Sequence, residues 1–470
     1  MEEPARRFEM NKVLSKRIKI LETMAEDMGL DPYPINYEVV SQDTMLEVIS
    51  YGLPTRARHW SYGQSYDYQK MQGEMGFSKV YEVVLNNNPS YAFLLDTNTD
   101  IANTMVAAHV IGHVHFFKNN YLFKQTDNKM VYHAAERAQR IEEYIQRYGI
   151  DAVERVMDIG FALDKHIDWH KGLNRKKYPR KRKYFTNVKR DEFSDLLDPK
   201  GLSKKIVVPE NKFPPNPERD ILWFLINYSR HLESWQIDVL EIIREETYYF
   251  YPQYMTKIMN EGFASFVHAY LMSDLECITH GEHLDFCGLH EKVVQAGRNN
   301  LNINPYFLGF KIFTDIQKRW DALYEEGKSD ITGLQKVYKV VETEDDISFI
   351  RNYLTKELTE ELKLFSYKNI QTPAGDKGIH ITGTELEKVI ESLTKDLYNY
   401  RAPLIAVTGI EDGFLQLDHQ SKEIGTLDPK HVEKVLEYVY EAWRAPVNLE
   451  TIDDAGSVIH YSYDELGFSG

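Results

Sequence analysis

Cysteine is nearly absent, with only Cys277 and Cys287 in a chain of 470 residues. This excludes a disulfide-stabilised scaffold, and in a reducing compartment both side chains would be thiols. Long apolar runs are missing as well: no stretch of about 18 apolar residues occurs. The segment MEEPARRFEM at the start has charges but lacks the apolar region of a signal peptide. We therefore expect a cytoplasmic protein without a membrane span.

Excess positive charge is also lacking, because the formal net charge is −16. A balance this acidic argues against general affinity for nucleic acid or for anionic membranes. The exception is RKKYPRKRKYFTNVKR (175–190), which is rich in Lys and Arg. This stretch is either a solvated loop between helices or a patch for an anionic ligand or partner.

Several catalytic signatures are absent. The chain has no G-x-x-x-x-G-K-[ST] and no G-x-S-x-G, so neither phosphoryl transfer nor a serine hydrolase is supported. None of the sixteen histidines has a glutamate three residues before it. A ferritin-like di-iron bundle needs two such Glu-x-x-His motifs, and that class is therefore excluded.

A histidine pair with metal-binding spacing is present in ANTMVAAHVIGHVHFFKNN (102–120). His109 and His113 are four residues apart, so on a helix both imidazoles project from one face and can share an ion. We predict such a helix over about residues 99–118. Val110 stands where a zinc hydrolase with an H-E-x-x-H helix would carry its glutamate base. A metal site is predicted here, with its base missing.

A third ligand is expected from IMNEGFASFVHAY (258–270). Glu261 and His268 fall on one face of a helix predicted over about 253–275, and NEGFA resembles the segment that supplies the glutamate ligand in zinc aminopeptidases. We predict that Glu261 completes the set with the two histidines, with His268 as a further ligand. The alternative is that this segment is an ordinary amphipathic helix.

The missing base has two candidates in REETYYFYPQY, namely Glu245 and Glu246. Either carboxylate could move protons or hold a ligating histidine in place. Solvated surface charge is the alternative for this pair. A separate structural zinc site in CITHGEHLDFCGLH (277–290) is another possibility, since thiols and imidazoles suit zinc, but its spacing matches no standard zinc finger.

The pattern of elements predicts an α+β fold. VYEVVLNNNPSYAFLLD (80–96) has the form of a β-hairpin, and helical periodicity dominates from 133 to 325. Near residue 328 the long helices give way to short strands that alternate with helices. We therefore predict two domains: a mainly helical metal-site domain with zinc-peptidase-like helices over 1–330, and a smaller α/β domain over 331–470.

Four segments carry a family resemblance: HVIGHVHFFKNN, REETYYFYPQYMTKIMNEGFASFVH, INPYFLGFKIF and DDISFIRNYLTKEL. Together they resemble the SpoVR family (stage V sporulation protein R) over nearly the whole chain. The resemblance implies a cytoplasmic bacterial protein needed for normal spore cortex formation. Some relatives accompany a serine protein kinase and a von Willebrand-type protein. Many relatives have Asp at the position of His115, so His115 is assigned no ligand role.

Two functional hypotheses follow. The first is a metal-dependent hydrolase or transferase of amide bonds acting on a peptidoglycan precursor, in which a divalent ion such as zinc polarises a carbonyl group. The second is a non-catalytic regulatory or scaffold protein that works with the serine protein kinase system. An open coordination position would favour the enzyme, whereas a site closed by a fourth protein ligand would favour a structural role.

Overall fold

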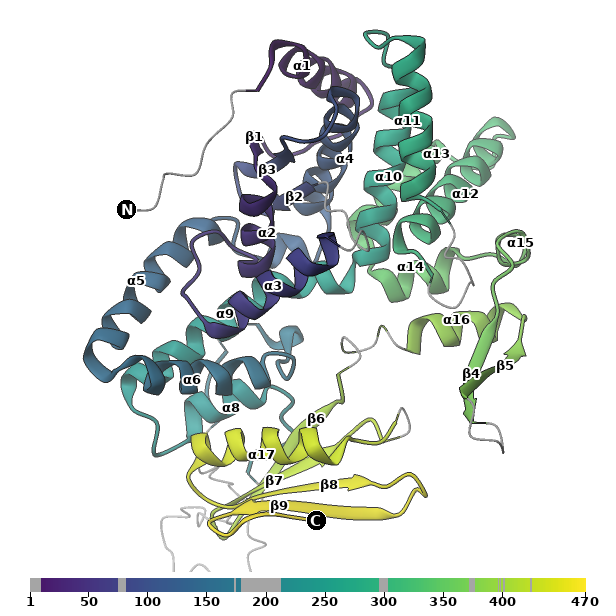
Figure 1. Ribbon diagram of the computed structural model, residues 1–470. Coiled ribbons are helices and arrows are strands. Elements are labelled where there is room, and N and C mark those ends of the chain that lie inside the picture. Colours follow the sequence, from purple (N-terminus) through teal and green to yellow (C-terminus); the bar gives the residue numbers. More distant parts are fainter. Residues whose placement is uncertain are drawn as a thin grey trace, which may run out of the picture. The chain divides into compact units, whose positions relative to one another are not determined.

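The computed structural model describes residues 10–74, 82–172, 175–178, 213–295, 303–371, 377–395, 397, 399, 402–422 and 425–470. Most of the basic stretch 175–190 lies outside these ranges. The fold is α+β and mostly helical, which confirms the predicted class (Figure 1). No helix among the described residues is both long enough and apolar enough to cross a membrane.

The chain divides into two compact units, each formed by two stretches of sequence. The first unit contains Met1–Ile150 and Tyr248–Arg401, and the second contains Asp151–Thr247 and Ala402–Gly470. This division differs from the boundary expected near residue 330. The reason is visible in the core: Val337 and other apolar residues beyond 330 are buried with those of the amino-terminal helices. The helices and strands that follow residue 328 are shorter, but those up to Val389 pack into the same core as the helices before them.

The first unit is built mainly of helices. Its helices are α1 (Lys12–Asp27), α2 (Gln42–Tyr51), α3 (Trp60–Glu74), α4 (Asp100–Asn119), α5 (Met130–Tyr148), α10 (Lys257–Ser273), α11 (His280–Val293), α12 (Pro305–Glu325), α13 (Gly333–Thr343), α14 (Asp346–Tyr353), α15 (Lys356–Glu361) and α16 (Leu386–Lys395), with a short 3-10 turn at Phe123–Gln125. Helix α4 is its centre, because every residue from Ile101 to Phe117 is buried. A helix that is apolar on all sides is one that other elements surround.

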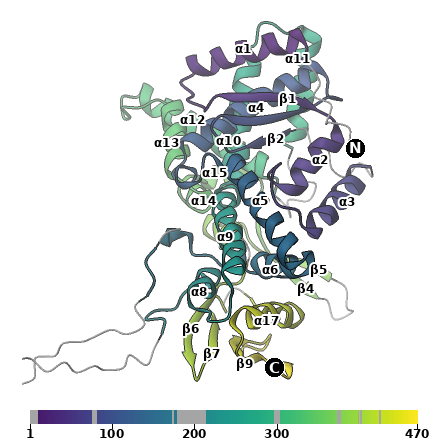
Figure 2. The ribbon, with the colours of Figure 1, turned by 90° about the vertical axis from the view of Figure 1, so that its left-hand side faces the viewer.

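Three strands of the first unit form a small sheet next to α4 and α1 (Figure 2). They are β1 (Ile35–Val40), β2 (Glu82–Leu85) and β3 (Ser90–Leu95), in the order β1-β3-β2. Strands β2 and β3 form the antiparallel hairpin predicted for 80–96, whereas β1 runs parallel to β3. A separate two-stranded hairpin consists of β4 (Ser366–Gln371) and β5 (Lys377–Gly383).

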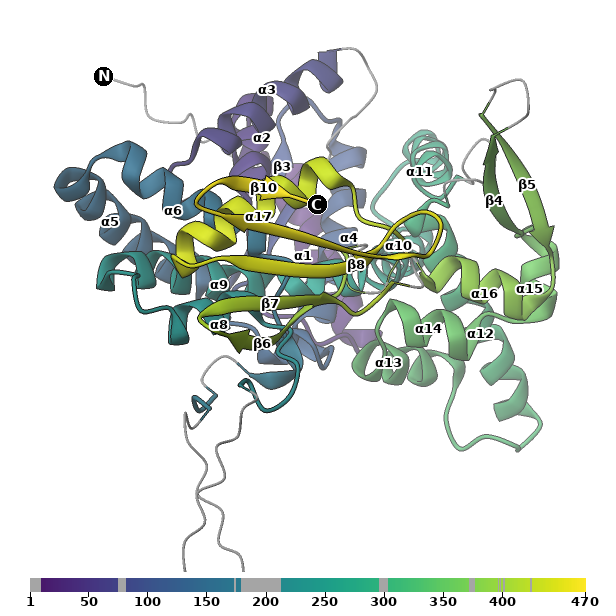
Figure 3. The ribbon, with the colours of Figure 1, turned by 90° about the horizontal axis from the view of Figure 1, so that it is seen from below.

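The second unit combines helices with a five-stranded sheet. Its helices are α6 (Ile150–Leu163), α8 (Ile221–Tyr228), most of α9 (Ser234–Met255) and α17 (Pro429–Trp443), with a 3-10 turn at Trp169–Lys171. Its strands are β6 (Ile405–Glu411), β7 (Phe414–His419), β8 (Val447–Ile452), β9 (Val458–Asp464) and β10 (Gly467–Ser469), side by side in the order β10-β9-β8-β7-β6 (Figure 3). Arg155 on α6 forms ion pairs with Glu437 and Glu441 on α17 and so ties the two stretches of sequence together.

Candidate metal centre

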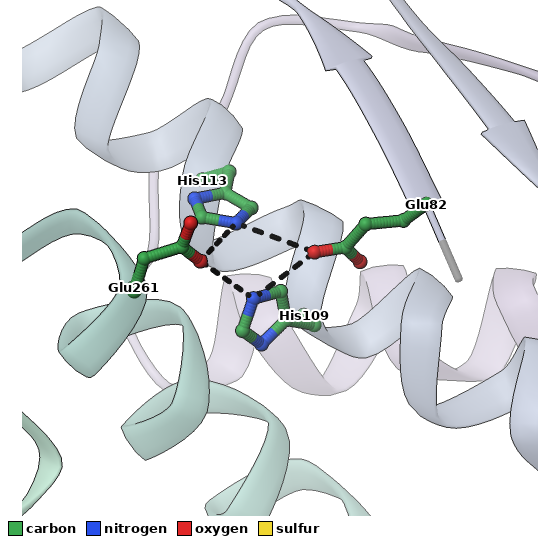
Figure 4. Close-up of side chains that lie close together, drawn as sticks. All are labelled: Glu82, His109, His113 and Glu261. Atoms are coloured by element: carbon green, nitrogen blue, oxygen red, sulfur yellow. Dashed lines mark ion pairs between the residues drawn. The ribbon is translucent and has the colours of Figure 1, made fainter. Parts of the chain in front are cut away.

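Four side chains of the first unit converge on one point: Glu82, His109, His113 and Glu261 (Figure 4). Helix α4 supplies both histidines, α10 supplies Glu261, and Glu82 is the first residue of β2. Each residue offers one ligand atom, and the four atoms lie within 4.8 Å of one another. Three residues that the sequence predicted as ligands therefore lie together, joined by one that it did not predict.

The nitrogen–oxygen distances are close to those between ligands of one ion. His109 Nε2 lies 3.2 Å from Glu82 Oε1 and 3.5 Å from Glu261 Oε2. The corresponding distances from His113 Nε2 are 3.5 and 3.4 Å. If four ligand atoms stand about 2.0–2.2 Å from a zinc ion, the edges of their tetrahedron measure about 3.3–3.6 Å. Three of the four nitrogen–oxygen distances lie in this range and the fourth, at 3.2 Å, is just below it, so all four are close to the length that a shared ion would impose.

Two of the atoms that face the centre are buried without a hydrogen-bond partner. They are His109 Nε2 and Glu261 Oε2. A buried polar atom left unpaired costs about 1–3 kcal/mol, so native structures keep few of them without a reason. Both atoms are ones that a divalent cation would accept as ligands, and binding it would remove this cost. The residues present therefore fit a metal ion.

Close packing of α4 against α10 brings the ligands together. Gly112 lies between the two histidines, and a Cβ atom added to it would stand 2.7 Å from the Cα atom of Ala264. On its other side α10 meets α12 in the same way, because a Cβ atom on Gly262 would stand 2.3 Å from the Cα atom of Gly309. Only glycine allows backbones to approach this closely. The site depends on these two contacts.

Outer hydrogen bonds orient both imidazoles. His113 Nδ1 lies 2.9 Å from Asn260 Oδ1, an acceptor, so this nitrogen carries a proton, and in the neutral ring Nε2 would present its lone pair to an ion at the centre. His109 Nδ1 lies 2.9 Å from His268 Nδ1, and His268 Nε2 lies 2.7 Å from His290 Nδ1. With His109 donating through Nδ1, the chain of three histidines is internally consistent, and His109 Nε2 is also free for an ion.

The pKa shifts of His113 and Glu261 show that these two groups stabilise each other's charged forms. Burial alone lowers the pKa of His113, but its interactions with the carboxylates of Glu261 and Glu82 outweigh burial and raise that pKa to about 10. Burial favours the protonated acid of Glu261, yet the nearby imidazoles of His109 and His113 hold the pKa of its carboxyl well below the usual value. A cation at the centre would take the place of the positive charge that His113 supplies.

The carboxylate side of the centre reaches solvent. The side chains of Glu82 and Glu261 are 18% and 14% exposed, against 5% and 4% for His109 and His113. Lys257, which is largely exposed, has its Nζ 3.7 Å from Glu261 Oε1. An ion bound here would be held from the buried side by nitrogen and would be approached from the side of the carboxylates.

Tyr306, at the start of α12, borders the same group. Its ring stacks on that of His109, with 6.0 Å between the centroids and 25° between the planes. Burial, followed by the charges of Glu261 and Glu82, raises the pKa of its hydroxyl far above the usual value, and the hydroxyl is hydrogen-bonded to Glu261. Tyr306 therefore keeps its proton at any physiological pH and can donate a hydrogen bond.

Comparison with known proteins assigns this chain to a family. The family described as "SpoVR like protein" matches residues 9–401. The chain belongs to this family. It is 30% identical over 474 aligned residues to a protein named "Uncharacterized protein YcgB" from Escherichia coli (strain K12), with 93% of this chain and 91% of that protein covered. No solved structure matches the chain.

The other predicted site residues of this SpoVR-family chain are not among the four that converge. His268 stands behind His109, joined to it by a hydrogen bond, and is not in the group of four. Glu245 and Glu246 lie on α9, half-buried and buried respectively, and are also outside the group. Cys277 and Cys287 are exposed, and among the described residues His, Cys, Asp and Glu side chains are grouped closely enough for a metal ion only at the centre above. The 277–290 zinc alternative therefore gains no support.

Sequence reasoning missed Glu82, Asn260 and Tyr306. A signal for Glu82 was available, because an acidic residue heads the apolar run EVVL of a predicted hairpin. Asn260 directly precedes Glu261, and Tyr306 follows the Asn-Pro that starts α12. No spacing rule connects these three residues to the histidine helix, since each lies on a different element from it.

Replacing Asn260 by alanine should weaken zinc binding by about 10–100-fold, the usual effect of removing an outer hydrogen-bond partner of a metal ligand. The reason is that the His113 ring loses the acceptor for its Nδ1 proton. Asn260→Asp keeps an acceptor oxygen and should bind zinc at least as tightly as the unaltered chain. Competition titration with a chromophoric chelator measures both affinities. Equal affinity in all three proteins would contradict the assignment of the hydrogen bond.

Proposed function

We propose that the chain is a metal-dependent hydrolase or transferase of amide bonds, with zinc bound by His109, His113 and Glu261. The observation that carries this proposal is the convergence of two imidazoles and a carboxylate, the ligand set of thermolysin-type zinc enzymes, with a second carboxylate beside them. The helices of the centre also resemble those of zinc peptidases in the His-x-x-x-His spacing and the NEGFA segment.

Glu82 is the group that we assign as general base. Val110 occupies the position where an H-E-x-x-H helix carries its glutamate, and Glu82 supplies a carboxylate from β2 instead, 3.2 Å from His109 Nε2. A bound zinc ion would polarise the substrate carbonyl and lower the pKa of bound water. Glu82 would accept a proton from the attacking water and pass it to the leaving nitrogen. Tyr306, held in its protonated form, would donate a hydrogen bond to the developing oxyanion.

The biological setting that we propose comes from the family. Membership in the SpoVR family supports a role in sporulation, in the cytoplasm, with a substrate related to the peptidoglycan of the spore cortex. The donor set supports catalysis over structure, because structural zinc sites are built mainly from cysteine and this centre has none. Partial exposure of both carboxylates would let a substrate reach the ion.

The second candidate is a non-catalytic regulatory or scaffold protein that works with a serine protein kinase. One observation favours it. Glu82 Oε1 lies 3.2 and 3.5 Å from the Nε2 atoms of the two histidines, as close as two ligands of one ion would be, so Glu82 could occupy the fourth coordination position. A site closed by four protein ligands has no position for water or substrate. The role of Glu82 therefore decides between the two candidates.

Glu82→Gln should keep one equivalent of bound zinc and lose function, because removing a general base typically lowers the rate about 10²–10⁴-fold while three ligands remain. Metal content gives the first result, and recovery of heat-resistant spores in an endospore former that lacks its own SpoVR-family gene gives the second. Glu245→Gln and Glu246→Gln serve as comparisons, since either residue remains an alternative base. Loss of zinc from Glu82→Gln would instead establish Glu82 as a fourth ligand and end the enzyme proposal.

A further inference from the structure

Asp346 is a buried acidic residue at the first position of α14, and its carboxyl group lies at the start of a second helix. Only 1% of the surface of this residue is exposed. Its Oδ2 accepts a hydrogen bond of 2.9 Å from the backbone N–H of Ile258, and its Oδ1 accepts one of 2.8 Å from Met259. One carboxyl group therefore joins two helices that are far apart in sequence.

Helix α10 needs this contact because its own cap is incomplete. Thr256 precedes the helix and makes no capping hydrogen bond with its side chain. Its hydroxyl instead donates to the carbonyl oxygen of Pro252. The first N–H groups of a helix have no partner within it, and the positive end of the helix dipole lies there. Asp346 satisfies two of these groups from outside the helix.

The capped turn is directly followed by a metal ligand. Met259 lies two residues before Glu261, so the N–H groups that Asp346 binds are within one helical turn of the ligand. Gly112 and Gly309 fix the sideways position of α10 through close backbone contacts, but such contacts leave sliding and rotation of the helix less restricted. A hydrogen-bonded anchor at the end of the helix restricts both.

We infer that Asp346 is a positioning residue of the metal centre: by holding the first turn of α10 it sets the place of Glu261 opposite His109 and His113. This inference rests on the proposed metal site and deepens it, because it adds a determinant of metal affinity that touches neither the ion nor a ligand side chain. The four converging side chains come from β2, α4 and α10, and α14 thereby becomes a fourth element on which the centre depends.

Burial raises the pKa of the Asp346 carboxyl to about 8, against the two backbone hydrogen bonds, which lower it. Both oxygens accept N–H groups, and the ionised form serves this better than the acid does. The test is therefore made at a pH above that value. Asp346→Asn is the primary variant, because an asparagine offers one acceptor oxygen and an NH2 group that faces the second N–H.

The matched control removes the cap of a helix on which no metal ligand lies. Thr332 caps α13 in the same unit by accepting from the backbone N–H of Gln335. Thr332→Ala should lower the melting temperature of the apo protein and leave its zinc affinity unchanged. Asp346→Asn should lower the melting temperature as well, but it should also weaken zinc binding about tenfold or more, as changes outside the ligand set commonly do.

Three readouts make the outcome decisive: zinc affinity, the melting temperature of the apo protein, and hydrogen exchange of the Ile258 and Met259 amides. Faster exchange at these two amides with weakened zinc binding supports the inference. Unchanged zinc affinity in Asp346→Asn, with binding intact in the unaltered chain, overturns it. If the unaltered chain binds no zinc, the proposed function fails, and exchange still tests the cap separately. Should Asp346→Asn not fold, Asp346→Glu keeps the charge but lengthens the side chain, and faster exchange at the two amides with unchanged zinc affinity in that variant would overturn the inference.

Discussion

Glu261→Gln should bind zinc at least about 100-fold more weakly than the unaltered chain, since losing a ligand exceeds the 10–100-fold effect of losing an outer partner. The amide of glutamine is a poorer ligand than a carboxylate, and it leaves the cationic form of His113 with Glu82 as its remaining partner among the four. Equilibrium dialysis followed by elemental analysis gives the bound zinc per chain.

The apo form of Glu261→Gln should also be less stable. Breaking a buried ion pair by removing one partner costs about 3–5 kcal/mol, although the partial exposure of Glu261 reduces this figure here. Glu360→Gln is a suitable control, because Glu360 lies on α15 with 69% of its side chain exposed and its nearest cation, Lys356, 3.8 Å away. It should change neither zinc binding nor stability. Full zinc occupancy in Glu261→Gln would remove this residue from the ligand set.

The part of the site that sequence could predict rests on local spacing. His109 and His113 lie four residues apart, and this spacing by itself puts both imidazoles on one face of a helix. Glu261 was found because its surrounding segment resembles one that supplies a known ligand. The predicted helix and hairpin also formed, at Asp100–Asn119 and at Glu82–Leu95. All of these features depend on residues that are close together in the chain.

The part that sequence could not predict depends on long-range contacts. Glu82 faces the histidines because strand pairing sets it opposite Leu94 at the edge of a sheet that lies against α4. His268 shares a helical face with Glu261, as predicted, yet its ring meets the Nδ1 side of His109. Periodicity gives the face of a helix but not how far each side chain reaches across to its neighbour.

The domain boundary shows the same limit. Residues 333–395 form short helices and a hairpin, a pattern that on composition alone looks like part of a separate domain. Burial of Val337 and Phe349 in the core of the first unit is a tertiary fact that local pattern does not contain. The two units also interleave along the sequence, with 151–247 in one and 248–401 in the other. Local sequence patterns cannot predict this, because it depends on contacts between distant segments.

Gly112→Ala should abolish detectable zinc binding without altering a single ligand. The new Cβ atom would stand 2.7 Å from the Cα of Ala264 and 3.2 Å from side-chain atoms of Ala264 and Val267. Backbone cannot yield as the end of a flexible side chain can, so α4 and α10 must separate. Overpacking of this kind typically costs about 1–3 kcal/mol. Glu261 lies on α10 and would move with it, away from both histidines, so the four side chains would no longer converge.

Gly288→Ala on α11 is the matched control, because nothing lies within 4 Å of the position that its Cβ would take. Alanine is favoured over glycine in a helix by about 1 kcal/mol, so this variant should be as stable as the unaltered chain or slightly more so. Calorimetric zinc titration and thermal unfolding of both variants separate loss of the site from loss of the fold. If Gly112→Ala folded and bound zinc with unchanged affinity, close approach of α4 to α10 would not be what assembles the centre.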